Sequence, residues 1–172
     1  MARARKTHPV PNQADEPAFL LSQVGAHSAF RFAERLAPLK LIPAHAGILR
    51  MIEQADGLSQ QALGEKLSIF ASRLVGHIDE LASRGYVERR DSPIDRRSYA
   101  LYLTKAGREV LRQIERIARE HQDALCAALT PSERAQLADL LRKIVDEQGL
   151  TPGVHPGYRK LGSLQTKGSS GS

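Results

Sequence analysis

Cysteine, aromatic residues and long apolar runs are all scarce in this chain. The single cysteine, Cys126, excludes an internal disulfide bond and a zinc site made of four cysteines, and it favours a reducing, cytoplasmic setting. Aromatic residues make up 5% of the chain and tryptophan is absent, so we expect a mainly helical core of leucine, isoleucine and alanine. No run of about 18 apolar residues exists, and no apolar run follows the basic N-terminus, so we expect neither a membrane span nor a secretory signal.

Motifs for catalysis and for cofactor binding are also missing. The sequence contains no glycine-rich phosphate loop, no Gly-x-Ser-x-Gly and no His-Glu-x-x-His. Its histidines are scattered, and no two of them stand four residues apart, so the spacing gives no sign of a metal site. We therefore expect no cofactor, no metal and no enzymatic activity. The histidines are His8, His27, His45, His77, His121 and His155.

Basic residues outnumber acidic ones. The formal net charge is +6 and the pI is near 9.8. Excess positive charge favours a partner that carries phosphate, although a membrane surface or simple solubility fits it almost as well. The length of 172 residues suits one domain, or a smaller domain with an added dimerisation element.

Composition divides the chain into three parts. Residues 1–14 are basic and lack periodicity, which predicts a flexible arm. Residues 149–172 are rich in glycine, proline and serine, which predicts a disordered tail. The folded part is then 15–148, with outer helices at 15–38 and 105–148 around a middle unit at about 43–104.

The middle unit has the pattern of a helix-turn-helix followed by a hairpin. One helix begins at Pro43, a second at 60–66 is capped by Ser59, and a third covers about 70–84. The segment 86–104 then reads as two short strands joined by a polar, arginine-rich loop. The fold class is therefore mainly α (α+β), a winged helix-turn-helix with N- and C-terminal dimerisation helices.

The outer helices carry more apolar surface than a lone monomer usually needs. Thr104 caps a helix from 105 to about 128, and Thr130-Pro131-Ser132-Glu133 opens the last helix. We expect the first and last helices to build a homodimer. The alternative is that they simply pack on the middle unit.

A helix, a turn and a basic hairpin in succession suit duplex DNA. The third helix of the middle unit has an exposed stripe of small and polar residues, which lets its backbone approach base edges in the major groove. An arginine at a hairpin tip can enter the minor groove, although a solvated turn is the alternative. The candidate DNA-binding residues are Ser72, Arg73, Val75, Gly76, His77, Arg90, Asp95, Arg96 and Arg97.

The same segments resemble the MarR family of winged-helix regulators. Asp95-Arg96-Arg97 followed by Leu101-Tyr102-Leu103-Thr104 is similar to the family's wing, and the runs 63–81 and 84–89 are similar to its helix-turn-helix and first wing strand. The resemblance covers about residues 18–148.

The resemblance implies a homodimer on double-stranded, pseudo-palindromic operator DNA. It places Ser72, Arg73, Val75 and Gly76 in the major groove and Arg97 in the minor groove, with Asp95 as the organiser of Arg97. This chain departs from the family at three positions. Phe70 replaces a small polar residue, Ser68 replaces the usual turn glycine, and Gly76 stands where relatives often carry a polar base reader.

Members of the family often bind a small phenolic or anionic molecule. The residues that could bind such an effector here are His27 and Arg31, one helical turn apart, and His45. The alternative is that Arg31 forms a structural ion pair and that the histidines serve packing. Cys126 lies in an apolar stretch, where a thiol is usually inert.

These observations predict a cytoplasmic, dimeric, ligand-responsive transcriptional regulator. Repression is favoured because a dimer on a promoter blocks polymerase. The alternative function is a winged-helix protein-interaction module without sequence-specific DNA binding.

Overall fold

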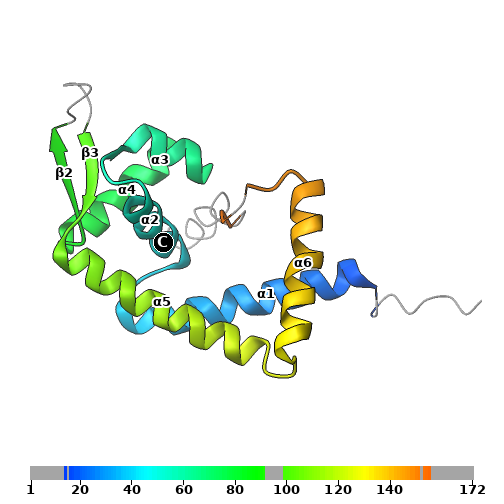
Figure 1. The fold of residues 1–172 in the computed structure, drawn as a ribbon. Helices are drawn as coiled ribbons and strands as arrows, with labels where there is room; N and C mark the ends of the chain where they lie inside the picture. Colours follow the sequence, from blue (N-terminus) through cyan, green and yellow to red (C-terminus); the bar gives the residue numbers. More distant parts are fainter. Residues whose placement is uncertain (1–13, 15, 92–98, 152, 156–172) are drawn as a thin grey trace, which may run out of the picture.

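The chain folds into a mainly helical structure with one small antiparallel sheet, which confirms the predicted fold class (Figure 1). The computed structural model describes residue 14 and residues 16–91, 99–151 and 153–155. A winged unit of three helices and the sheet sits at one end of two long helices, and a final helix projects at their other end (Figure 1). No helix in this described part of the chain is both long and apolar enough to cross a membrane.

The helices of the winged unit begin where local sequence signals place them. α2 (Pro43–Gln54) has proline in its first turn, where the missing N–H costs no hydrogen bond. α3 (Gln60–Leu67) begins after Ser59, whose hydroxyl accepts a hydrogen bond from the backbone N–H of Ala62. α4 (Ala71–Ser83) follows a three-residue turn and lacks a side-chain cap.

The sheet has three strands, one more than the sequence indicated. β2 (Val87–Asp91) and β3 (Tyr99–Leu103) form the expected hairpin, with Val87 opposite Leu103. β1 (Leu58–Ser59) pairs with the other edge of β3, so the strand order is β1-β3-β2. Two residues carry no periodic signal, and β1 exists only because β3 supplies its hydrogen bonds.

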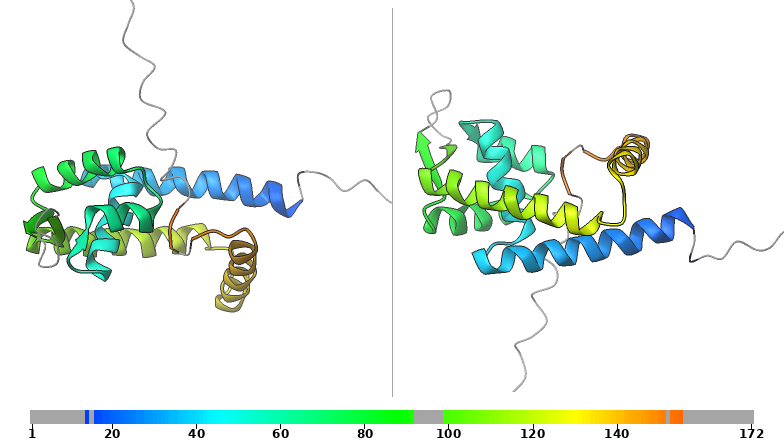
Figure 2. Two further views of the ribbon diagram at one scale, coloured as in Figure 1. Left: turned by 90° about the horizontal axis from the view of Figure 1, so that it is seen from above. Right: turned by 60° about the horizontal axis from the view of Figure 1, so that its bottom comes forward.

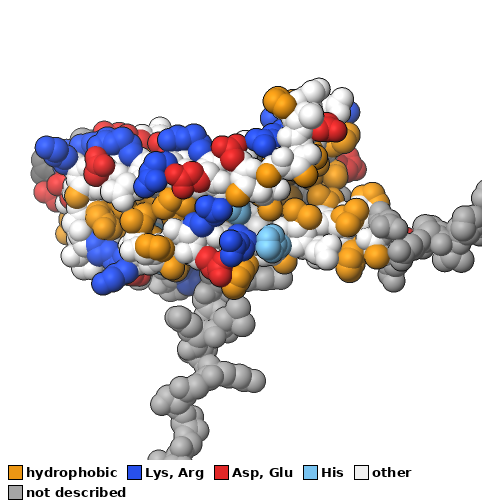
Figure 3. Space-filling model, turned by 90° about the horizontal axis from the view of Figure 1, so that it is seen from below, with side chains coloured by type: hydrophobic (Ala, Val, Ile, Leu, Met, Phe, Trp, Pro, Cys, Tyr) orange, Lys and Arg blue, Asp and Glu red, His pale blue; other side chains and the backbone are white. Residues whose placement is uncertain are grey.

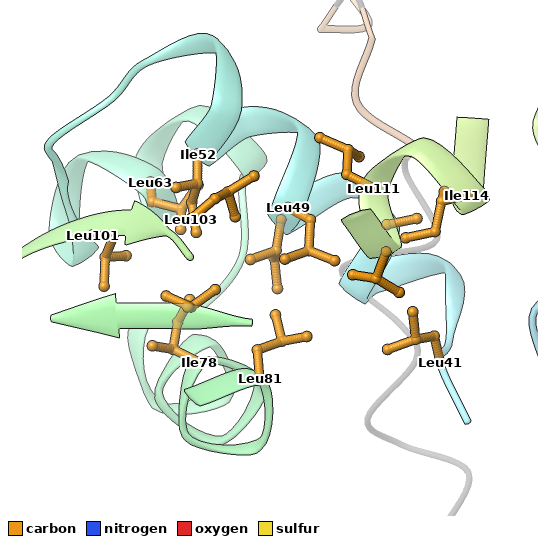
Figure 4. Packing of buried hydrophobic residues seen from close by; sticks show 14 of the residues in the cluster. Leu41, Leu49, Ile52, Leu63, Ile78, Leu81, Leu101, Leu103, Leu111 and Ile114 are labelled. Carbon is orange, nitrogen blue, oxygen red and sulfur yellow. The ribbon is translucent and has the colours of Figure 1, made fainter. Parts of the chain in front are cut away.

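The core lies between the sheet and the helices of the winged unit and continues into the first turns of α5 (Figure 4). Leu49 and Ile52 from α2 meet Ile78 and Leu81 from α4 in this cluster. Ile114 extends the same cluster along α5. The apolar side chains hold α4 against the scaffold by one face only, which leaves its other face open.

Two long helices, α1 (Pro17–Leu36) and α5 (Lys105–Leu125), run side by side (Figures 1 and 2). A short 3-10 turn, η2 (Ala37–Leu39), follows α1. α6 (Pro131–Glu147) begins with the predicted capping box: Thr130 accepts from the N–H of Glu133, and the Glu133 carboxylate accepts from the N–H of Thr130. The backbone N–H and the hydroxyl of Thr130 both donate to the Glu133 carboxylate, and these two hydrogen bonds lower the pKa of Glu133 because they favour its charged form.

The structure differs from the sequence prediction at the end of α5 and in the segment after α6. α5 stops at Leu125 rather than near residue 128. The segment predicted as a disordered tail from residue 149 is in part packed, because Val154 lies partly buried against the core and its N–H donates to the carbonyl of Thr151. The arm 1–13 and residues 156–172 lie outside the described residues.

Candidate nucleic-acid interface

The exposed face of α4 carries the residues expected to reach the major groove. Leu74 and Ile78 point into the core, so the residues between them turn outward. Gly76 lies in the middle of this outward face, and a Cβ built on it meets nothing within 4 Å. Ser72, Val75 and Gly76 are exposed, and Arg73 and His77 are half-buried.

The turn that leads into α4 contains two of the three departures found in the sequence. Ser68 has φ 52°, the left-handed conformation that favours glycine, and it ends α3 in that conformation. Phe70 precedes α4 and is 69% exposed. The Arg73 guanidinium lies 5.8 Å from the centre of the Phe70 ring, so the ring supports an arginine on the interface.

The strands of the wing are fixed to α4 by an ion pair. Arg89 on β2 donates to the Asp79 carboxylate on α4 at 2.5 Å. Arg90, a predicted DNA contact, pairs with Glu88 and lies over the Tyr102 ring at 4.4 Å. The wing strands therefore keep a set position beside the outward face of α4.

The tip of the wing is not part of the structural description. Asp95, Arg96 and Arg97 lie outside the described residues, which end at Asp91 on β2 and resume at Tyr99 on β3. Their assignment to DNA therefore stays a prediction. The strand ends on either side of them belong to the hairpin that Arg89 ties to α4.

His77 differs from its neighbours on the outward face of α4. Its Nδ1 lies 3.2 Å from His45 Nε2, so one of its ring nitrogens faces α2. Glu80 Oε2 lies 3.3 Å from the same His45 nitrogen. Burial lowers the pKa of His45 to about 4, against the attraction of the Glu80 carboxylate, and burial also lowers the pKa of His77.

This cluster corrects the sequence prediction for His45. His45 was grouped with His27 and Arg31 as an effector site, but its side chain is 1% exposed and contacts α4. The spacing of the histidines gave no sign of a cluster, and the fold joins His45 and His77, with Glu80, into one polar cluster. The spacing His77-x-x-Glu80 places two ligand-type side chains on one helix face, and that was the only signal available in the sequence.

The other two predicted effector residues do line a common cavity. His27 and Arg31 on α1 meet His121 on α5 around a space of about 210 Å³, which Arg35 also lines. His121 Nε2 lies 3.0 Å from Ser28 Oγ. Desolvation, and then the charges of Arg35 and Arg31, lower the pKa of His121, so the positive charge at this cavity belongs to the arginines. Figure 3 shows histidine side chains next to basic ones on this face.

The surroundings of Arg31 and Arg35 bear on whether these arginines have a structural role or bind an effector. Arg31 forms an ion pair with Glu34 at 2.6 Å, as expected of a structural arginine. Both side chains are about half exposed, so the pair adds little stability and can open. Arg35 also lines the cavity, and its Nε is buried without a hydrogen-bond partner among the described residues.

Apolar side chains remain exposed on the outer helices. Phe30 on α1 is 62% exposed and Leu140 on α6 is 57% exposed. α6 contains no buried residue at all, so it does not pack on the winged unit as the alternative required. Figure 3 shows hydrophobic side chains along α1 and α6 on one face. The exposed apolar residues of the two helices are Phe19, Leu20, Leu21, Val24, Phe30, Leu137, Leu140 and Ile144.

A helix-turn-helix flanked by a three-stranded wing, on a stem of long helices, defines a winged helix-turn-helix protein. The family model for the MarR family matches residues 43–99. A transcriptional regulatory protein described for the hcr operon of Thauera aromatica is 32% identical over 143 residues, which cover 82% of this chain and 86% of that protein. The chain belongs to the MarR family.

Solved structures of the same family agree with this assignment. A mutant MarR from E. coli complexed with operator DNA is 29% identical, with a TM-score of 0.66 over 74% of this chain and 92% of that one. The transcriptional repressor CouR bound to a 23-mer DNA duplex is 29% identical, with a TM-score of 0.69 over 77% of this chain and 94% of that one. These relatives are regulators of transcription and not enzymes.

Proposed function

We propose that this protein is a sequence-specific repressor that binds a pseudo-palindromic operator as a homodimer. The observation that carries the proposal is the outward face of α4, small at Gly76 and Ser72, with the wing strands tied beside it by Arg89 and Asp79. A helix with such a face can approach base edges in the major groove. Two structural relatives are bound to DNA, and one of them is a repressor.

The homodimer is supported by the exposed apolar faces of α1 and α6. Exposed apolar side chains on these two helices are stabilised when a second copy covers them. A two-fold dimer would present two α4 helices, and each would read one half of the operator. The spacing of the two α4 helices then has to match about one turn of DNA, roughly 34 Å.

Arg97→Ala should weaken operator binding by about 1–3 kcal/mol, if Arg97 makes the minor-groove contact that the family resemblance implies. Binding is measured by fluorescence anisotropy, with a duplex that the wild-type protein recovers from genomic DNA and with excess competitor DNA. Sedimentation of the complex should show two protein chains on each duplex.

Arg142→Ala is the matched control for that experiment. Arg142 lies on α6, pairs with Asp139 and is well exposed, so its loss removes the same charge away from the wing. Its affinity for the duplex should stay close to that of the wild type. Equal affinities of Arg97→Ala and the wild type for the duplex would remove the wing from the mechanism. A wild-type protein that binds no duplex would favour a protein-interaction module.

We further propose that a small anionic, often phenolic, ligand releases the protein from DNA. The cavity between α1 and α5 supports this, because His27, Arg31 and Arg35 line it and two arginines there would attract an anion. A ligand can shift the spacing of the two halves only by its differential affinity for the two arrangements.

Arg31→Ala should weaken the effect of an aromatic carboxylate, such as 4-hydroxybenzoate, about tenfold, because one charge-assisted contact is lost. The carboxylate is titrated into the protein–DNA complex, and the concentration that releases half of the DNA is compared. Operator affinity without the carboxylate should not change. Arg116→Ala is the control, because Arg116 lies on α5 in an exposed pair with Glu120. A parallel loss of operator affinity in Arg31→Ala would assign this arginine to structure instead.

A further inference from the structure

A buried histidine on α2 and two side chains on α4 converge at one point of the winged unit. One ligand atom from each of His45, His77 and Glu80 lies within 4.8 Å of the others. We propose that these three residues bind a divalent transition-metal ion, with Zn²⁺ as the ion that fits them best. The site would join the scaffold helix to the helix that faces DNA.

The distances suit a tetrahedral ion. His45 Nε2 lies 3.2 Å from His77 Nδ1 and 3.3 Å from Glu80 Oε2. Zinc binds histidine nitrogen and carboxylate oxygen at about 2.0–2.2 Å, so neighbouring ligand atoms in a tetrahedron are about 3.3–3.5 Å apart. Two of the three spacings therefore already match a tetrahedral zinc site, and all three ligand atoms lie within 4.8 Å of one another.

A hydrogen-bonded network has similar distances, but it satisfies the atoms less well. Neutral His45 carries one N–H, and both His77 Nδ1 and Glu80 Oε2 face its Nε2. One proton cannot serve both acceptors fully. An ion at this point would accept a lone pair from all three atoms. His45 Nδ1 has no partner among the described residues; it would carry the N–H when Nε2 binds an ion, and a lone pair when Nε2 carries the proton.

The surroundings of Glu80 fit a metal-binding carboxylate. Its Oε1 accepts from Arg84 Nη2 at 2.5 Å, while its Oε2 is the atom that faces His45. Arg84 is itself held, because its Nη1 donates to the carbonyl of Lys40 at 2.5 Å. A carboxylate oriented in this way by a neighbouring hydrogen bond is typical of protein metal sites.

The site is also accessible. His45 is 1% exposed, but the Glu80 side chain is 43% exposed, so an ion can enter from the α4 surface. Two histidines and one carboxylate leave the fourth position of a tetrahedron for water. The ion would cross-link α2 and α4. It would hold the His77 side chain toward α2, at the edge of the outward face of α4.

Cobalt is the probe for the test, because tetrahedral Co²⁺ absorbs visible light and replaces Zn²⁺ in such sites. The full chain, without a polyhistidine tag, is treated with a chelator and titrated with Co²⁺. We expect visible d–d absorption that saturates at one equivalent per chain and disappears when Zn²⁺ is added. His77→Gln and Glu80→Gln should each weaken Co²⁺ binding by more than about 100-fold, because even the loss of an outer partner costs 10- to 100-fold.

Two controls keep the result interpretable. His121→Gln, which alters a half-buried histidine between α1 and α5, should keep the full cobalt signal. His77 and Glu80 lie on the partly exposed side of α4, so the two Gln variants should keep the far-UV circular dichroism of the wild type. His45→Gln is less informative, because His45 is buried and its replacement can disturb folding.

Three results would overturn the proposal. The first is a folded wild-type protein without d–d absorption, which would leave the cluster as a hydrogen-bonded network only. The second is an undiminished signal in both His77→Gln and Glu80→Gln. The third is a thiolate-to-cobalt charge-transfer band, or a signal lost in His155→Gln, since either would mean binding by Cys126 or the C-terminal segment instead.

Discussion

Gly107→Ala should destabilise the protein by about 3 kcal/mol, although glycine-to-alanine changes inside helices usually stabilise. Gly107 lies in the first turn of α5, where that helix passes over the start of the wing. A Cβ built on Gly107 would lie 2.0 Å from the Tyr86 carbonyl oxygen and 2.9 Å from the Tyr86 carbonyl carbon. These are backbone atoms, so no side-chain rotation can relieve the clash.

The contacts around Gly107 make a shift of α5 costly as well. Thr104 caps α5 by accepting from the N–H of Gly107 at 2.9 Å. The Thr104 hydroxyl donates to the carbonyl of Gly85 at 2.6 Å. The backbone N–H of Thr104 donates to the carbonyl of Tyr86 at 3.1 Å. Moving the helix away from Tyr86 would break this arrangement, and the cap alone is worth about 1 kcal/mol.

Urea denaturation at equal chain concentration measures the effect, and Gly76→Ala is its matched control. Gly76 also lies inside a helix, but its Cβ would meet nothing within 4 Å, so its replacement by alanine should stabilise by about 0.5–1 kcal/mol. The two substitutions are chemically identical and should have opposite signs. An unfolding midpoint for Gly107→Ala equal to that of the wild type would show that α5 can leave Tyr86 at no cost.

The sequence predicted the helices well because their starts are determined locally. Pro43, Thr104 and Thr130 each begin a helix as expected, since a cap or a first-turn proline acts on backbone groups within four residues. The hairpin was predicted for the same reason. β1 was missed because its two residues become a strand only by pairing with β3, about forty positions further along the chain.

The candidate sites were predicted less completely because they depend on which helix faces meet. The exposed face of α4 followed from the period of its buried leucine and isoleucine residues. Whether His45 on α2 would face α1 or α4 could not be read from any local pattern, and the fold joined it to His77, 32 residues away. The same limit applies to Val154, whose packing on the core depends on the path of the chain after α6.

Gly76→Glu should weaken operator binding by at least about 100-fold, or roughly 2.7 kcal/mol, while leaving the fold intact. Gly76 lies at the centre of the α4 face that we propose to enter the major groove, between Ser72 and Val75 on one side and His77 on the other. A carboxylate at this position would face the phosphates and the acceptor-rich edges of the bases. Two like charges about 5 Å apart repel by about 3 kcal/mol at the effective dielectric constant of a protein surface.

Gly76→Gln separates charge from size in this experiment. Glutamine has nearly the shape of glutamate without its charge, and its amide can donate to or accept from a base edge. If Gly76→Gln keeps most of the affinity, the loss in Gly76→Glu is electrostatic and the phosphate backbone lies within a few ångströms of α4. If both variants lose binding equally, the helix backbone itself approaches the bases, and the absence of a side chain at position 76 is what permits the contact.

The stability of each variant distinguishes these outcomes from misfolding. The open space around Gly76 predicts that Gly76→Glu and Gly76→Gln unfold at urea concentrations no lower than the wild type, because glutamate and glutamine both have a higher helix propensity than glycine. Affinity and stability should therefore change in opposite directions at this position. A Gly76→Glu variant that is stable and binds the operator as tightly as the wild type would remove α4 from the DNA interface, whatever the wing does.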